Sequence, residues 1–140
     1  MKHCRLLEER DIPWMLDLAK RRYGDDGTYD YVGAEQWFRN IALKGPMVFL
    51  PIRMSGSFLI AMVSCLPWMP NNFECNIVWV VADDGCMWQA LALLKVSVEW
   101  ARRRRCTEWR VASETEHEMG ALAKRLGALE ITPRYKLRLD

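Results

Sequence analysis

The sequence predicts a single α+β domain, residues 1–140, with a strand–helix–strand unit at the centre of its sheet. Three observations support this prediction. Hydrophobic residues make up 51% of the 140 residues, so the chain can bury one core. Segments with the apolar pattern of strands are interspersed with segments of helical periodicity. The strongest strand signal, residues 73–82, is followed by the longest helical pattern and then by another strand.

The N-terminal third predicts a short strand and two helices. Residues 4–8 alternate weakly and predict the first strand. Asp11 is a favourable N-cap and Pro13 suits a first helical turn, so a helix should follow and end near Gly24. Residues 34–43 predict the second helix. Its buried side is predicted to hold Trp37, Phe38 and Ile41.

The middle of the chain predicts three consecutive strands. Residues 47–54 form the first of them, and Pro51 favours an edge position or a bulge. The dipeptide Ser55-Gly56 predicts a tight turn before the next strand, residues 58–68. Residues 73–82 give the third strand, in which continuous apolar residues predict burial on both faces. These apolar residues are Ile77, Val78, Trp79, Val80 and Val81.

The remaining residues predict helices and strands in alternation. In order, they are a helix at residues 86–105, a strand at 108–112, a helix ending at Gly127, and a final strand or short bent pair at 128–139. Thr115 and Glu118 form a capping box that would open the second of these helices. Gly127 is suited to the left-handed conformation that ends many helices.

Charge argues against a nucleic-acid-binding protein. The formal net charge is +2, and residues 95–140 carry +4 against −2 for the rest. That bias is far weaker than the basic surface of a typical nucleic-acid-binding domain. Four consecutive arginines, residues 102–105, follow a predicted helix and suit the negative end of its dipole. Nucleic acid is therefore not an expected partner.

Other patterns indicate a cytoplasmic protein without a membrane partner. No apolar run reaches the roughly 18 residues of a membrane-spanning helix, and no apolar stretch near the N-terminus predicts a signal peptide. The five cysteines are odd in number and none form a Cys-x-x-Cys pair, which favours a reducing compartment. With only two histidines, a zinc-ligand pattern is absent, and we expect no metal.

The junction between the central strand and the following helix, residues 80–94, is the first candidate site. A helix N-terminus presents free amide groups and a partial positive charge, so it can bind an anion. Gly85 is the one glycine there that allows close approach of a ligand to the backbone. Asp83 and Asp84 would repel a phosphate, and an ordinary capped helix start is the alternative.

The order of elements, the long helix after the central strand and the ending Ala-Lys-Arg-Leu-Gly-Ala, residues 123–128, resemble the GNAT superfamily of N-acetyltransferases. The resemblance implies a mixed, mostly antiparallel sheet flanked by helices, around a central β-α-β unit. In the family, an Arg/Gln-x-x-Gly-x-Gly/Ala turn holds the pyrophosphate of acetyl-CoA. Here that turn falls on residues 85–90: Ala90 matches, Gly85 replaces the Arg or Gln, and Trp88 replaces the middle glycine.

The resemblance implies that acetyl-CoA is the cosubstrate. The pantetheine arm would pair with the backbone of residues 80–82, and amides of residues 85–90 would hold the pyrophosphate. The implied binding residues are Val80, Val81, Ala82, Gly85, Cys86, Met87, Trp88, Gln89 and Ala90. A tryptophan where the backbone should approach a phosphate is a steric objection to this binding.

Two catalytic residues are implied by the same resemblance. Glu74, at the start of the central strand, stands where some family members carry a general base that deprotonates the amine. The position of the family's general-acid tyrosine falls on Ala123. Tyr135 is the only tyrosine in the C-terminal third, and it either reaches the site as the acid or packs on the sheet.

The expected function is transfer of an acetyl group from acetyl-CoA to an amine of a small molecule or a protein. Acceptor specificity in such folds lies in the first helices and loops, here residues 17–40. The alternative is a binding or structural protein that keeps the fold without the chemistry, as some small bacteriophage-encoded proteins do. Trp68 and Trp88 fall in predicted loops, where an exposed aromatic side chain would mark a ligand or partner surface. The sequence leaves a homodimer open.

Overall fold

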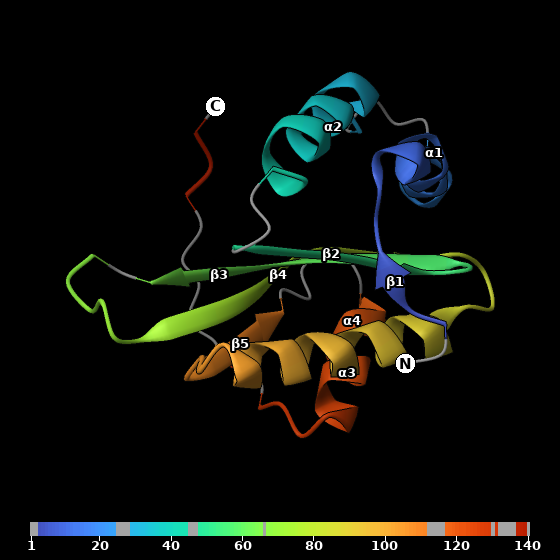
Figure 1. The fold of residues 1–140 in the computed structure, drawn as a ribbon. Helices are drawn as coiled ribbons and strands as arrows, with labels where there is room; N and C mark the ends of the chain where they lie inside the picture. The colour runs from blue at the N-terminus through green and yellow to red at the C-terminus, as the bar shows by residue number, and fades with distance from the viewer. Residues whose placement is uncertain are drawn as a thin grey trace.

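A computed structural model describes residues 3–24, 29–44, 48–65, 67–111, 117–129, 131 and 137–139. In Figure 1 a single sheet separates two layers of helices, with α1 and α2 on one face and α3 and α4 on the other. The helices are η1 (Glu9–Asp11), α1 (Ile12–Tyr23), α2 (Tyr31–Trp37), η2 (Phe38–Ala42), α3 (Met87–Arg103) and α4 (His117–Arg125). This arrangement confirms the predicted α+β class.

The sheet is mixed and mostly antiparallel, as predicted. Its strands are β1 (Arg5–Leu6), β2 (Phe49–Met54), β3 (Ser57–Cys65), β4 (Phe73–Ala82) and β5 (Glu108–Val111). They lie side by side in chain order, and only the β4–β5 pair is parallel. A parallel pair needs a crossover, and α3 supplies it across one face of the sheet. The predicted central β-α-β unit is therefore β4–α3–β5.

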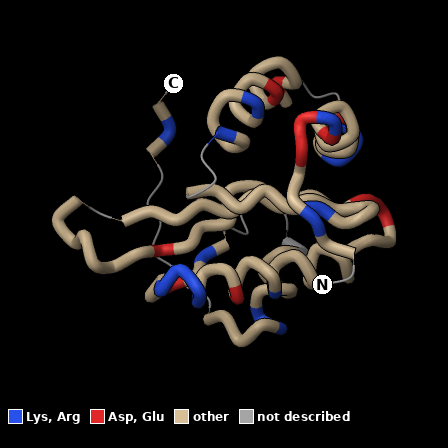
Figure 2. Tube along the Cα trace, in the orientation of Figure 1, with Lys and Arg blue, Asp and Glu red and all other residues tan. Residues whose placement is uncertain are grey.

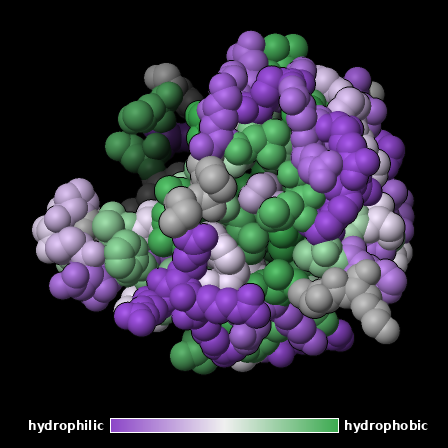
Figure 3. Space-filling model, viewed as in Figure 1, coloured by the Kyte–Doolittle hydropathy of each residue, from purple (hydrophilic) through white to green (hydrophobic). Residues whose placement is uncertain are grey.

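Two apolar cores lie on opposite faces of the sheet. On the α1 and α2 side, Phe38 and Phe58 are fully buried among the apolar residues of α1. On the α3 side, Leu93 and Leu94 pack against strand residues and against Met119 of α4. Figure 3 shows apolar side chains reaching the surface between α1 and α2 on the viewed face. Successive residues of each strand point to opposite faces of the sheet, so the strands contribute side chains to both cores.

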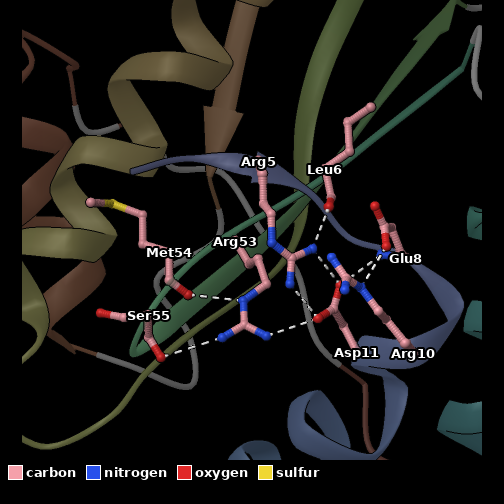
Figure 4. Close-up of polar contacts among 8 residues, drawn as sticks. All are labelled: Arg5, Leu6, Glu8, Arg10, Asp11, Arg53, Met54 and Ser55. Atoms are coloured by element: carbon pink, nitrogen blue, oxygen red, sulfur yellow. Dashed lines mark hydrogen bonds and ion pairs between the residues drawn. The ribbon is translucent and has the colours of Figure 1, made fainter. Parts of the chain in front are cut away.

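A buried carboxylate fastens β1, β2 and α1 together (Figure 4). Asp11 is only 4% exposed. Its oxygens accept hydrogen bonds from Arg5 at 2.6 and 2.7 Å, from Arg53 at 3.0 Å and from the Glu8 amide at 2.8 Å. The hydrogen bonds from Arg5 hold the pKa of Asp11 well below its usual range, and those from Glu8 and Arg53 act in the same direction. Asp11 occupies the predicted N-cap position, but its side chain binds these cations instead of capping α1.

Several predicted boundaries and faces are wrong. The strand predicted to reach residue 68 ends at Cys65, because Pro67 cannot donate to a strand ladder. Ile41 is 47% exposed instead of buried, because η2 is a π-helix and an extra residue in a turn changes which residues face inward. Of the final strand or bent pair predicted at 128–139, Ala128, Leu129, Ile131 and residues 137–139 lie in no strand, and the other residues of that range lie outside the description.

Other expectations fall partly outside the described residues or concern the whole chain. Thr115 of the predicted capping box lies outside them, and Gly127 takes the predicted left-handed conformation, with φ of +86°. All five cysteines are free thiols. Among the described residues, no helix is long and apolar enough to cross a membrane.

Candidate functional site

A β-bulge divides β4 into two halves. Residues 79–82 pair with residues 57–60 of β3, and residues 73–77 pair with residues 61–65. Val78 therefore has no partner on β3, and its side chain is 43% exposed. A bulge of this kind bends the strand and increases its local twist. The prediction that the apolar run would be buried on both faces is wrong at Val78 for this reason.

The described pairing between β4 and β5 ends at the bulge. Residues 74–77 of β4 pair in register with residues 108–111 of β5. Residues 112–116 lie outside the description, and the described part of β5 borders only the first half of β4. The second half of β4, residues 78–82, has β3 as its one described neighbour.

The alternation of hydrogen bonds along the β3–β4 ladder shows which backbone groups of residues 78–82 point away from β3. The Asp83 amide donates to the Gly56 carbonyl at 2.8 Å, so these two residues form a hydrogen-bonded pair. In an antiparallel ladder, bonded and non-bonded pairs alternate. The N–H and C=O groups of Val80 and Ala82 therefore point away from β3, toward the edge of β4 along which β5 pairs with residues 74–77.

The N-terminus of α3 continues this row of groups. The Cys86 amide donates to Asp83 at 3.0 Å, and the amides of Gln89 and Ala90 donate to Cys86. Within the described part of the chain, the amides of Gly85, Met87 and Trp88 have no acceptor. Gly85 has φ of +74°, which a glycine adopts at little cost. The turn thus leaves three amides beside the positive end of the α3 dipole.

The β2–β3 turn holds α3 in place. The side chain of Gln89 accepts a hydrogen bond from the Gly56 amide at 2.7 Å and donates to the Ser55 hydroxyl at 2.9 Å. A Cβ atom at Gly56 would lie 2.6 Å from the Cys86 sulfur, so the close contact requires glycine there. Gln89 therefore positions the amides of the helix N-terminus, a role that the sequence did not indicate.

Trp88, which replaces the middle glycine of the family's turn, is not buried. Its side chain is 61% exposed at the surface of α3. In the second position of the helix, a side chain can point to solvent while its own amide stays at the helix end.

Arginines of α1 pair with the acidic residues of the turn. Arg21 lies 3.3 Å from Asp83, and Arg22 lies 3.3 Å from Asp84. Figure 2 shows acidic residues at the turn between β4 and α3, close to α1. Each pair is partly exposed and worth little to stability, but together the arginines offset the charge that would repel a phosphate. The sequence alone could not show this, since 62 residues separate the members of each pair.

Glu74 lies in the first half of β4, four residues before the bulge, or about 13 Å along the strand. Its carboxylate is 3.4 Å from Arg110 of β5, which also pairs with Glu108 at 2.6 Å. Tyr135, the other predicted catalytic residue, lies outside the described residues. Ala123 is buried in α4 and has no proton to donate.

A separate cavity of about 420 Å³ lies between β5 and α4. It is lined by small and apolar residues together with Arg110 and Lys124. The residues that line it include none from β4 or α3, so we do not assign the site to it. The described residues include no group of three or more potential metal ligands.

Comparisons with known proteins agree with the predicted fold. No protein-family model matches the sequence, and no curated protein matches it significantly. Many solved structures are similar over nearly the full length of both chains, and three of them serve as examples. A transcriptional regulator from Bacillus halodurans has a TM-score of 0.75 at 15% identity, covering 97% of this chain and 98% of the other.

The other two structures are N-acetyltransferases. A ribosomal-protein-alanine N-acetyltransferase from Brucella melitensis has a TM-score of 0.72 at 17% identity, covering 97% of each chain. A glucosamine-6-phosphate N-acetyltransferase from Arabidopsis thaliana has a TM-score of 0.71 at 14% identity, covering 98% of this chain and 97% of the other. At such low identity these likenesses concern the fold alone, and they confirm the predicted GNAT fold.

Proposed function

We propose that this chain, which has the fold of the GNAT acetyltransferases, transfers an acetyl group from acetyl-CoA to an amine. One observation carries the proposal: among the described residues, the backbone groups of Val80 and Ala82 that point away from β3 have no partner, and three amides at the start of α3, a few residues farther along, have no acceptor. Acetyl-CoA carries its thioester on a long arm that contains amide groups, and a pyrophosphate lies at the far end of this arm. The arm matches the backbone groups of β4, and the pyrophosphate matches the amides at the start of α3.

Three parts of acetyl-CoA have a counterpart in the chain: the pantetheine arm, the pyrophosphate and the acetyl group. The two amide groups of the pantetheine arm would pair with Val80 and Ala82 as a neighbouring strand does. The pyrophosphate would accept hydrogen bonds from the amides of Gly85, Met87 and Trp88. The acetyl group would then lie farther along β4, toward the bulge at Val78.

The reaction requires a neutral amine. In this proposal the Glu74 carboxylate takes a proton from the ammonium through a chain of water molecules, because it lies several residues from the bulge. The amine nitrogen then attacks the thioester carbonyl carbon, so that a C–N bond forms and the C–S bond breaks. The departing thiolate takes a proton, for which Tyr135 is the proposed donor. The products are an acetamide and CoA.

Calorimetric titration with fragments of the cosubstrate tests the proposed binding mode. Acetyl-CoA should bind most tightly and CoA nearly as well, because both carry the arm and the pyrophosphate. S-acetyl-pantetheine, which lacks the pyrophosphate, should bind at least tenfold more weakly, and ADP should bind weakly because it lacks the arm. No heat and no thermal shift with millimolar acetyl-CoA would reject the proposal.

Activity requires a separate measurement. A panel of primary amines is incubated with acetyl-CoA, and acetylated product is detected by mass spectrometry. Glu74→Gln should lower kcat at neutral pH, and the loss should shrink as the pH rises and more amine is already neutral. Binding of acetyl-CoA without acetylation of any amine in the panel would favour a binding protein with the same fold.

A further inference from the structure

Four aromatic side chains form a cluster between α1, α2 and β4. We call Tyr23, Tyr29, Tyr31 and Trp79 the aromatic cluster. Tyr29 is at its centre: its ring stacks on Tyr23 at 5.6 Å and lies 6.4 Å from both Tyr31 and Trp79. All four side chains are half-buried rather than enclosed in the core. The cluster therefore presents aromatic surface at the edge of the sheet face covered by α1 and α2.

Hydrogen bonds fix the orientation of these rings. The Trp79 indole donates to the Tyr23 hydroxyl at 2.9 Å. The Tyr29 hydroxyl donates to the Leu16 carbonyl at 3.3 Å, and the Tyr31 hydroxyl donates to the Asp17 carboxylate at 3.4 Å. Because their polar atoms already have partners, the rings offer a ligand mainly their faces.

Two carboxylates, Asp17 and Asp30, lie beside the cluster, and the arginines that precede Tyr23 in α1 pair with Asp83 and Asp84. Burial raises the pKa of Tyr29 to about 12, and its neighbours Tyr31, Tyr23, Asp17 and Asp30 act in the same direction. Asp17 and Asp30 are both exposed. In η2, the cation Arg39 already pairs with Glu35 and Glu9. The local field thus favours a cation over an anion.

The cluster adjoins the proposed acetyl-CoA site. Trp79 directly follows the bulge residue Val78, and Val80 comes next with its open backbone groups. The Trp79 side chain packs against Phe58 and Tyr29, so it lies on the sheet face covered by α1 and α2. A molecule held against this cluster would approach the thioester from that face.

We propose that the acceptor is a primary amine that binds as an organic cation, either an alkylammonium or an arylalkylammonium. It would bind against the aromatic cluster and the carboxylates of Asp17 and Asp30. This inference rests on the proposed function. Aromatic faces attract cations and pack against apolar chains and rings. The two carboxylates add attraction for the ammonium and repel acceptors that carry phosphate or carboxylate groups.

The test uses three probes of the same shape and different charge. The Trp79 indole N–H resonance, assigned with Trp79→Phe, is followed by NMR during titration with 2-phenylethylamine, 2-phenylethanol or 3-phenylpropionate at neutral pH. We expect the ammonium to shift this resonance with an affinity at least tenfold higher than the alcohol, and the carboxylate to bind least. Equal affinity for the ammonium and the alcohol would overturn the proposal.

Matched variants separate the faces of the rings from their hydroxyl groups. Tyr29→Leu should weaken binding of 2-phenylethylamine at least fivefold, whereas Tyr29→Phe, which keeps the ring, should change it less than twofold. Asp30→Asn removes charge but keeps a good N-cap for α2, whose Gly33 amide bonds to this side chain at 2.9 Å. Asp30→Asn should weaken the binding of 2-phenylethylamine two- to threefold and leave the binding of 2-phenylethanol unchanged. Equal effects of both Tyr29 variants would contradict the role of the ring.

The outcomes distinguish this inference from the proposed function. Acetyl-CoA binding is measured on the same samples by calorimetry. If acetyl-CoA binds and the ammonium shows no preference over the alcohol, the acetyltransferase proposal stands and the acceptor class is wrong. If the ammonium binds as expected but acetyl-CoA does not bind, the acceptor role is overturned together with the proposed function.

Discussion

The N-termini of α1 and α3 are both polar, but their hydrogen-bonding groups are used differently. At α1, Pro13 lacks an amide hydrogen, and the carboxylate of the preceding Asp11 is bound by two arginines and a backbone amide (Figure 4). At α3, neither a side-chain cap nor a proline is present, and the amides of Gly85, Met87 and Trp88 have no described acceptor.

The difference indicates which start of a helix serves folding and which serves binding. A buried, fully bonded group contributes to stability and cannot bind anything else without losing its partners. Amides at an exposed helix end bond to water and can exchange that water for an anion at little cost. Changes at α1 should therefore alter stability, and changes at α3 should alter ligand affinity.

The largest effect is expected at the α1 corner. Asp11→Ala should lower the free energy of unfolding by about 2–3 kcal/mol, because it leaves Arg53 buried without its carboxylate. The loss of stability is smaller than for a fully buried ion pair because the Arg5 side chain is 42% exposed to water. Chemical denaturation at pH 7 measures the loss. Arg10→Ala, which removes an exposed ion pair with Glu8, is the control and should change stability by less than about 0.5 kcal/mol.

The same corner should give an acid-dependent stability. The pKa of Asp11 is lowered in the folded protein, so as the pH falls the unfolded chain binds this proton first. Its contribution is complete above the unfolded pKa, near 4, and is lost as the pH falls below it. Between pH 4 and pH 2 the wild-type protein should lose more stability than Asp11→Ala. Parallel pH profiles for the two proteins would contradict the assignment.

Deleting the bulge residue tests the open half of β4. Without Val78, the residues Ile77 and Trp79 would still face opposite sides of a regular strand. The regular strand should bend less at this point and close the space for the pantetheine arm. We expect acetyl-CoA affinity to fall roughly 10- to 100-fold, the loss of one or two hydrogen bonds. A folded deletion variant with unchanged affinity would show that the bulge does not create the site.

A proline at the second residue of α3, where α1 has Pro13, allows the two helix N-termini to be compared directly. Trp88→Pro removes one free amide at a position where α1 itself accepts Pro13. It should weaken acetyl-CoA binding about tenfold, the value of a hydrogen bond to a charged group. Calorimetry measures the affinity, and circular dichroism checks that α3 is intact.

The smallest effect is expected from Trp88→Ala, the matched control. It keeps the amide and removes only the exposed indole, so affinity should change less than twofold. Stability should change by less than about 0.5 kcal/mol. If Trp88→Ala weakens binding as much as Trp88→Pro, the indole and not the amide makes the contact.

Patterns along the chain were enough to predict most of the fold. The apolar run in β4 and the helical period after it are local signals, because neighbouring residues determine them. The left-handed Gly127 is local in the same sense. The resemblance to the GNAT superfamily identified the fold, and the structural comparisons agree with it.

Details of the candidate site depend on contacts between distant residues. The bulge at Val78 is defined by pairing with β3, and the pairs of Arg21 with Asp83 and of Gln89 with Gly56 join segments far apart in the chain. Periodicity cannot reveal such contacts, because it reports only which side of an element is apolar. It also could not show that Trp88 is largely exposed, since a tryptophan is as often buried.

The sequence by itself therefore determined the order of the elements, the mixed sheet and the place where a helix N-terminus follows the central strand. Only the tertiary structure decided that the described part of β5 stops opposite Ile77 of β4 and which amides lack an acceptor among the described residues. The physical reason is that secondary structure follows from local periodicity and capping, whereas the satisfaction of a hydrogen-bonding group depends on which distant partner the folded chain brings to it.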